Sequence, residues 1–179
     1  MKFKTFRFKK VKSTNNTAIK KVKNSKIKYG MIISESQNNG RGQYGKKWIS
    51  YKGNLFVSFF FRLKDLNISI KKITKLNCLL VKNLLSIYYK KKIIFKKPND
   101  LLIDKKKICG ILQESLISFN KKYLIVGIGI NLIKSPYIKK YPTTNLYELI
   151  GKKISKKRIE SEIKKIFELK LTRLYKKNS

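Results

Sequence analysis

Apolar runs and helically spaced apolar residues divide the chain into expected strands and helices. Short runs rich in β-branched and aromatic residues predict strands. The expected strands cover residues 29–35, 54–63, 93–95, 101–103, 107–118 and 122–132. Apolar residues three and four positions apart predict two amphipathic helices, at about 71–89 and 155–177. Ser13-Thr14-Asn15 is expected to cap a short helix that ends near Val22.

The order of these elements indicates an α+β domain with a mixed, largely antiparallel β-sheet flanked by helices. Residues 119–121 separate two long strands and predict a hairpin. We find no internal repeat and no linker rich in proline, glycine or serine. The 179 residues are therefore expected to form a single domain over 1–179, with the motif-bearing part in 1–150.

The chain is strongly basic. It has 45 Lys+Arg against 9 Asp+Glu, a formal net charge of +36, and only five of the 45 are arginine. Such a charge is compatible with a basic nucleic-acid-binding module. However, dedicated phosphate and base recognition favours arginine, so we interpret the lysines mainly as a solvated surface. The same charge would speed the encounter with an acidic protein partner.

Other compositional features exclude several classes of protein. With no histidine, the chain has no Ser-His-Asp triad and no histidine-ligated zinc. Its two cysteines, Cys78 and Cys109, do not make a disulfide framework. No apolar run approaches the roughly 18–20 residues of a membrane span, and the N-terminus lacks a secretory signal. We expect a reduced, soluble, cytoplasmic protein without membrane contact.

Three segments could carry chemistry. Residues 37–45 contain three glycines between two strands, so the backbone could wrap an anion beside Arg41, or form an ordinary loop. Residues 96–114 contain the turn Pro98-Asn99-Asp100 and then Lys107 and Gly110 within a strand.

The third segment is residues 126–131, in which Gly127, Gly129 and Asn131 share one face of a strand. That face has room either for a flat ligand or for a closely packed neighbouring element.

In order and spacing, these motifs resemble the catalytic domain of biotin protein ligases over about residues 1–150. The resemblance is carried by Ser13-Thr14-Asn15, Glu35-x-Gln37-x-x-Gly40-Arg41-Gly42-x-x-Gly45-x-x-Trp48, Lys96-x-Pro98-Asn99-Asp100, Lys107-x-x-Gly110-Ile111-Leu112-x-Glu114 and Gly127-x-Gly129-Ile130-Asn131. It implies a fold like that of class II aminoacyl-tRNA synthetases. It also implies ATP-dependent ligation of biotin, through biotinyl-5′-AMP and with Mg²⁺, to a lysine of the biotin carboxyl carrier protein of acetyl-CoA carboxylase or a similar carboxylase.

The resemblance also implies roles for individual residues. The implied catalytic residues are Lys107, Arg41 and Asp100, with Asp100 as a ligand of Mg²⁺. The implied biotin-binding residues are Ser13, Thr14, Asn15, Gln37, Arg41, Gly42, Gln43, Lys107, Gly110, Gly127 and Gly129. The implied nucleotide-binding residues are Arg41, Trp48, Asn99, Lys107 and Asn131. Because an exposed lysine contributes little to stability, replacing Lys107 is expected to leave the fold nearly intact.

The chain departs from the family pattern at two positions. Gln43 stands where family members commonly have arginine, and Lys97 where they have tryptophan. We expect a leakier biotinyl-AMP intermediate unless Lys46 or Lys47 supplies the missing charge. The chain begins and ends close to the motif region, so we expect neither a DNA-binding N-terminal domain nor a C-terminal β-barrel. No specific DNA target is expected, while a homodimer is compatible with the sequence.

Three alternatives remain open. A lipoate or octanoate ligase or transferase would share the fold. A basic nucleic-acid-binding module would bind DNA or RNA with a steep salt dependence and perform no ATP chemistry. A carrier-binding protein without turnover would fail to release pyrophosphate.

Overall fold

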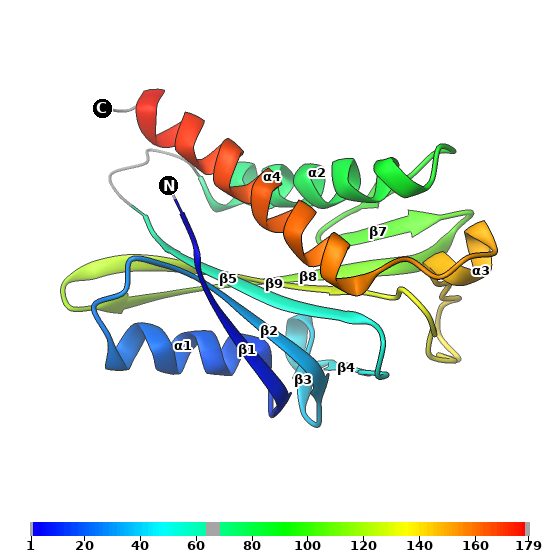
Figure 1. The fold of residues 1–179 in the computed structure, drawn as a ribbon, viewed down its shortest axis with the longest axis horizontal. Coiled ribbons are helices and arrows are strands. Elements are labelled where there is room, and N and C mark those ends of the chain that lie inside the picture. The colour runs from blue at the N-terminus through cyan, green and yellow to red at the C-terminus, as the bar shows by residue number, and fades with distance from the viewer. Residues whose placement is uncertain (1, 64–68, 178–179) are drawn as a thin grey trace.

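A seven-stranded sheet forms the centre of the computed structural model, which describes residues 2–63 and 69–177 (Figure 1). Its strands are β1 (Lys4–Val11), β2 (Tyr29–Gln37), β5 (Leu55–Arg62), β6 (Ile94–Lys96), β7 (Asp100–Ile103), β8 (Lys106–Ser118) and β9 (Lys121–Ile130). Their order is β1-β2-β5-β9-β8-β7-β6. Only the β1–β2 pair is parallel, so the expectation of a mixed, largely antiparallel sheet is confirmed.

Helices cover both faces of this sheet. One face carries α1 (Thr14–Asn24), and the opposite face carries α2 (Ile70–Tyr88) and α4 (Lys156–Lys177), while α3 (Leu146–Ile150) is a short connecting helix (Figure 1). The larger apolar cluster lies under α2 and α4, where the rings of Phe59 and Phe167 stack 4.2 Å apart. A smaller cluster lies under α1 and includes Ala18, Val22 and Phe60.

The central strand β5 is a continuous apolar run that forms a strand and not a helix. Seven of its eight residues are buried, because β2 and β9 flank it and helices cover both of its faces. Such an environment favours β-branched and aromatic side chains at every position rather than at alternate ones.

The first strand is the main element that the sequence analysis did not anticipate. Strand β1 lies at the edge of the sheet and pairs only with β2, so most of its residues stay partly or fully exposed. Alternation of Phe6 and Phe8 with basic residues was the available signal. The backbone N–H of Phe3, just before this strand, donates to Glu168 Oε1 of α4 at 2.8 Å.

The hairpin between β8 and β9 places the glycines of both strands on one face. Phe119 and Asn120 form its turn with φ of 50° and 53°, the left-handed conformation of a tight two-residue connection. The resulting register sets Gly110 opposite Gly129 and Leu112 opposite Gly127. These positions lie on the same side of the sheet as α1.

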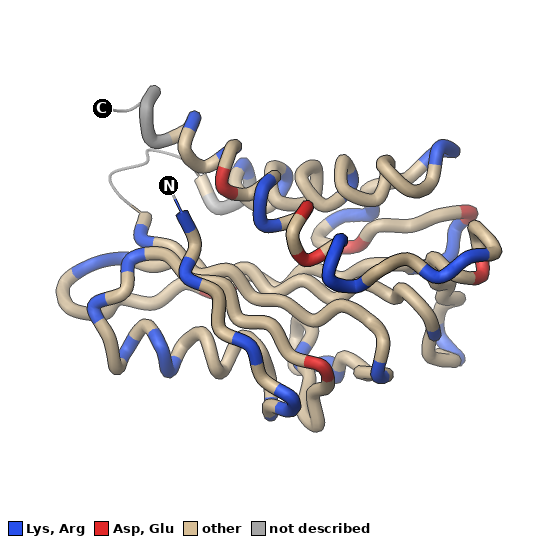
Figure 2. The backbone as a smooth tube through the Cα atoms, viewed as in Figure 1, with Lys and Arg blue, Asp and Glu red and all other residues tan. Residues whose placement is uncertain are grey.

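Basic residues are distributed over helices, strands and loops instead of being gathered on one element (Figure 2). This distribution agrees with a generally solvated basic surface. None of the described helices combines the length and apolar character that a bilayer span requires.

Candidate active site

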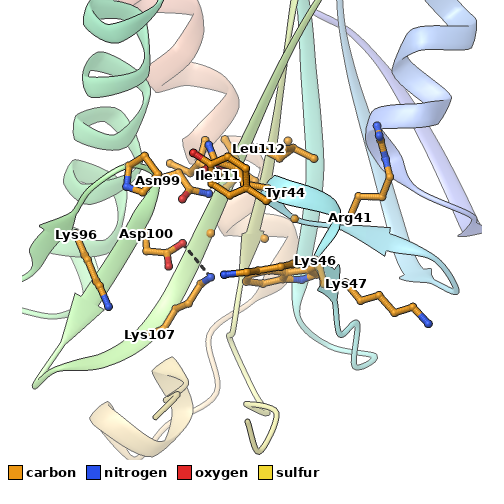
Figure 3. Close-up of a pocket in the computed structure, with 18 of the residues that line it drawn as sticks. Arg41, Tyr44, Lys46, Lys47, Lys96, Asn99, Asp100, Lys107, Ile111 and Leu112 are labelled. Carbon is orange, nitrogen blue, oxygen red and sulfur yellow. Dashed lines mark hydrogen bonds and ion pairs between the residues drawn. The ribbon is translucent and has the colours of Figure 1, made fainter. Parts of the chain in front are cut away.

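A cavity of about 480 Å³ lies on the α1 face of the sheet (Figure 3). Five parts of the chain line it: the start of α1, the segment after β2, the turn before β7, strands β8 and β9, and residues 140–142. All the residues assigned to the site from the sequence line this cavity except Asn131. The volume is typical of sites for small organic ligands.

Lys107 and Asp100 form an ion pair at the centre of the site. Lys107 Nζ lies 2.9 Å from Asp100 Oδ1, and the two side chains are 16% and 23% exposed. The ammonium also lies 5.4 Å from the ring centroid of Trp48 and 5.3 Å from that of Tyr141. These contacts hold one cation in a fixed position with limited access to water, so it can interact strongly with an anionic ligand.

The start of α1 contributes three buried polar residues. Ser13 is the N-cap of the helix, as expected from the sequence. The backbone N–H and Oγ1 of Thr14 both donate to Gln37 Oε1, at 2.7 and 3.1 Å. Asn15 Oδ1 accepts from Ser58 Oγ at 2.6 Å, which fixes the orientation of its amide. The polar groups at this end of the cavity are therefore preorganised by hydrogen bonds.

Arg41 is held by a carboxylate. Its Nη2 lies 2.8 and 2.6 Å from the two carboxylate oxygens of Glu114, and Glu114 Oε2 also accepts from Asn15 Nδ2 at 2.7 Å. Figure 3 shows the Arg41 guanidinium directed away from Lys107 and Asp100. The sequence motif contained Glu114 but gave no role for it, because the contact joins residues that are 73 positions apart.

The glycine face is covered by side chains, which is the closely packed one of the two alternatives that the sequence left open. A Cβ at Gly110 or Gly129 would lie 2.6 or 2.4 Å from the indole of Trp48, and one at Gly127 would lie 2.2 Å from Asn15 Oδ1. The glycines thus permit close packing of the protein's own side chains. A ligand at Gly110 and Gly129 meets the indole instead of bare strand.

Asn131, for which the resemblance implied nucleotide binding, does not line the cavity. It is 2% exposed, and its Nδ2 donates to the carbonyl of Thr144 at 3.1 Å. Its backbone N–H and C=O bond to Ile108 and Leu146. Asn131 therefore braces the segment after β9 and lies outside the cavity. Asn99 lines the cavity, although its Nδ2 is also bonded, to the Ile111 carbonyl at 2.7 Å.

The glycine-rich segment is a small hairpin instead of the loop that its glycines predict. Strands β3 (Gly40–Arg41) and β4 (Lys47–Trp48) pair on either side of the 3₁₀ turn η1 (Gln43–Gly45). Three buried polar atoms of this hairpin have no hydrogen-bond partner among the described residues: Arg41 Nε, Gln43 Oε1 and Trp48 Nε1. Unpartnered buried groups beside a cavity are available to a ligand.

Further residues that the sequence did not suggest also line the cavity. They are Tyr44, Lys105, Lys140 and Tyr141, and they join Lys46, Lys47, Lys96 and Lys97, which the motif region already contained. Residues 140–142 reach the site because the backbone N–H of Lys107 donates to the Pro142 carbonyl at 2.9 Å. No local pattern predicts this long-range contact, and single lysines cannot be distinguished in so basic a sequence.

By itself, the cavity supplies few protein ligands for a metal ion. Asp100 is the only acidic residue among the described residues that line it. No group of three or more histidine, cysteine, aspartate or glutamate residues occurs in the part of the chain that the structure describes. This donor set fits a Mg²⁺ that is bound mainly by substrate phosphates, with one carboxylate from the protein.

Comparison with known proteins gives a consistent result. A sequence model of the Biotin/lipoate A/B protein ligase family matches residues 7–131. The Bifunctional ligase/repressor BirA of Escherichia coli (strain K12) is 30% identical over 125 residues, or 68% of this chain. The chain spans 38% of the length of that curated relative.

Solved structures extend the comparison to the fold. The biotin protein ligase from Aquifex aeolicus, in complex with biotin and ATP, has a TM-score of 0.80 and 30% identity, covering 95% of this chain and 71% of that one. P. falciparum LipL1, in complex with lipoate, has a TM-score of 0.63 and 13% identity, covering 99% and 63% of the two chains. At that identity the likeness to LipL1 shows only the fold.

Proposed function

We propose that this chain, which belongs to the Biotin/lipoate A/B protein ligase family, activates biotin with ATP and transfers it to a lysine of a carrier protein. One observation carries the proposal: the Lys107–Asp100 pair lies in a single cavity that the glycine hairpin and the start of α1 also line. The likeness to a ligase that was solved with biotin and ATP supports it.

In the first step, an oxygen of the biotin carboxylate attacks the α-phosphorus of ATP. The bond from that phosphorus to the bridging oxygen breaks, and pyrophosphate leaves, so biotinyl-5′-AMP remains. Both reactants are anionic, and charge builds up on the phosphoryl oxygens in the transition state. The fixed ammonium of Lys107 contacts the carboxylate and the α-phosphate and offsets this charge.

In the second step, the neutral amine of the carrier lysine attacks the acyl carbon, AMP leaves with the electrons of the acyl–phosphate bond, and the nitrogen gives up one proton to solvent. Asp100 accepts a hydrogen bond from the incoming amine and orients it. Asp100 and Lys107, to which we give these roles, lie on the adjacent strands β7 and β8 and form an ion pair, which supports the proposal.

The other assignments are those that the resemblance implies, and the positions of these residues in the cavity support them. The polar groups of Ser13, Thr14 and Gln37 bind the head of biotin, and the indole of Trp48 packs against the nucleotide. Asp100 would be the protein ligand of a Mg²⁺ held mainly by the substrate phosphates, and the ion would supply further positive charge there. Arg41 acts through its bonds with Glu114 and braces the hairpin.

The carrier that we propose is the biotin carboxyl carrier protein of acetyl-CoA carboxylase or a similar carboxylase. Lysines surround the cavity, so an acidic carrier surface would be attracted to the mouth of the site.

The test is an incubation of the protein with ATP, Mg²⁺ and biotin, read out as pyrophosphate release and ATP–pyrophosphate exchange. A biotinylatable carrier domain is then added, and transfer is measured by mass spectrometry. We expect exchange that depends on biotin, followed by a mass increase of the carrier. Parallel reactions with lipoate or octanoate test the alternative of a lipoate-type ligase. Exchange that requires lipoate and ignores biotin would overturn the proposal.

A further inference from the structure

The ammonium of Lys107 has two aromatic neighbours besides its ion-pair partner Asp100. Its Nζ lies 5.4 Å from the ring centroid of Trp48 and 5.3 Å from that of Tyr141. Both distances fall within the roughly 6 Å over which the face of an aromatic ring attracts a cation. Asp100 and Trp48 belong to the sequence motifs, whereas Tyr141 lies outside them, so its contact with Lys107 has no explanation in the motifs.

The backbone brings Tyr141 to this position. Strand β9 ends before it reaches the level of Lys107, and residues 142–144 take its place beside β8. The N–H of Lys107 donates to the Pro142 carbonyl at 2.9 Å, and its C=O accepts from the Thr144 N–H at 3.0 Å. Tyr141 comes directly before this paired segment, so the pairing places its ring beside the Lys107 side chain.

The segment that carries Tyr141 is itself anchored to the rest of the fold. The hydroxyl of Thr143 donates to the Pro136 carbonyl. On the other side, the buried Asn131 donates from Nδ2 to the Thr144 carbonyl at 3.1 Å. These bonds hold the segment against β8 without help from a ligand. The ring of Tyr141 is therefore in place before any substrate binds.

We propose that Tyr141 is a positioning residue, whose ring holds the Lys107 ammonium where the reacting anions meet. This inference rests on the proposed function. The flexible four-carbon stem of a lysine lets its ammonium take many positions, and a fixed one is needed to stabilise the transition state. Asp100 fixes the ammonium but also cancels part of its charge. An aromatic ring has no net charge, so Tyr141 fixes the cation and leaves its charge available to the substrates.

The first experiment compares Y141F, Y141L and Y137L with the wild type in the pyrophosphate exchange assay. Y141F keeps the ring, whereas Y141L keeps apolar bulk without a ring face. We expect Y141L to lower kcat about tenfold while the KM values for ATP and biotin stay within about twofold, and Y141F to stay within about twofold of the wild type. Tyr137 lies in the same segment and is 91% exposed, so Y137L should behave as the wild type. Equal losses in Y141F and Y141L, or no loss in Y141L, would overturn the proposal.

A double variant tests whether Tyr141 acts through Lys107. If it does, adding Y141L to K107A should cause no further loss of exchange, because the cation that the ring positions is already gone. Urea midpoints of the four proteins show that each one is folded. A tenfold loss in both backgrounds would mean that Tyr141 contacts the substrate or supports the site in another way, and the positioning role would be wrong.

A readout without turnover separates this proposal from the proposed function. The free protein is treated briefly with acetic anhydride, and acetylation at each lysine is followed by mass spectrometry. We expect Lys107 to react about fivefold faster in Y141L than in the wild type, Y141F or Y137L, because its ammonium is less well held. Lys106, in the same strand, should react equally in all four proteins and serves as the internal reference.

The two readouts distinguish the possible failures. If the wild type shows no biotin-dependent exchange but the acetylation of Lys107 follows this pattern, the proposed ligase activity is wrong and the positioning of Lys107 by Tyr141 stands. If exchange occurs but Y141L leaves the acetylation of Lys107 unchanged, the ligase activity stands and the positioning role is wrong.

Discussion

At the residue scale, Lys107 illustrates how far a sequence motif determines a side chain's environment. The motif singles out Lys107 as the catalytic cation, but the expectation that its side chain is exposed is wrong: it is 16% exposed and paired with Asp100. The difference arises because strand β7 and residues 141–142 close over it, and neither neighbour is apparent from local sequence.

We therefore predict two effects of K107A. Pyrophosphate exchange should fall at least about 100-fold, because the main cation of the transition state is lost. The free energy of unfolding should also fall by about 1–3 kcal/mol, because Asp100 loses its partner in a partly buried site. Urea unfolding and the exchange assay measure the two effects.

K106A is the matched control in the same strand. Its ion pair with Glu148 spans 3.9 Å at the surface, and we expect the free energy of unfolding to fall by less than about 1 kcal/mol. An unchanged exchange rate in K107A would remove Lys107 from the mechanism.

Arg41 and Glu114 give a second prediction at this scale. Two short contacts join them, so the R41A and E114A losses in unfolding free energy should be non-additive by on the order of 1 kcal/mol. The comparison cycle uses Arg158 and Glu162, which lie 3.0 Å apart on α4 with Arg158 exposed, and should give a smaller non-additivity. If the losses in unfolding free energy of R41A and E114A were additive, the ion pair between Arg41 and Glu114 would not contribute to stability.

At the element scale, the strands were easier to predict from the sequence than the site they form. The continuous apolar run of β5 and the helical spacing of α2 have one physical interpretation each, and both were located within one or two residues. The glycines of β8 and β9 had two possible interpretations: an open face or a closely packed one. The sequence could not decide between them, because the filling groups, Trp48 and Asn15, come from segments far away in the chain.

This packing predicts that G129A acts through Trp48. The added Cβ would lie within 2.4 Å of the indole, so the hairpin must shift, and we expect a loss of about 1–3 kcal/mol in unfolding free energy. In a W48A background the space is free and most of this loss should disappear. Thermal and urea unfolding of the four proteins measure the coupling. The same loss in both backgrounds would mean that Gly129 is required for another reason.

At the scale of the whole molecule, the fold class followed from the order of elements, but the edge strand β1 did not. A strand that is paired on only one side needs few apolar residues, and the basic side chains of β1 conceal its alternating pattern.

The interior of the molecule contains both cysteines. Burial raises the pKa of Cys78 to about 12 and raises that of Cys109 well above its ordinary value.

These thiols predict how stability changes with pH. In the unfolded chain the two thiols ionise at about pH 8.5, whereas in the folded protein they stay protonated to much higher pH. The unfolded state therefore binds fewer protons above that pH, and the free energy of unfolding should fall as pH rises from about 8.5 to about 11. Urea midpoints measured across this range should fall more steeply for the wild type than for a C78A/C109A variant. Identical slopes would show that the thiols do not contribute.

The hydrogen bond from Phe3 to Glu168 has a practical consequence for handling the protein. It brings the N-terminal segment beside α4, on the side of the sheet opposite the cavity (Figure 1). An affinity tag or surface attachment at the N-terminal end would therefore point away from the mouth of the site. Immobilised protein should remain accessible both to small ligands and to a bulky macromolecular acceptor.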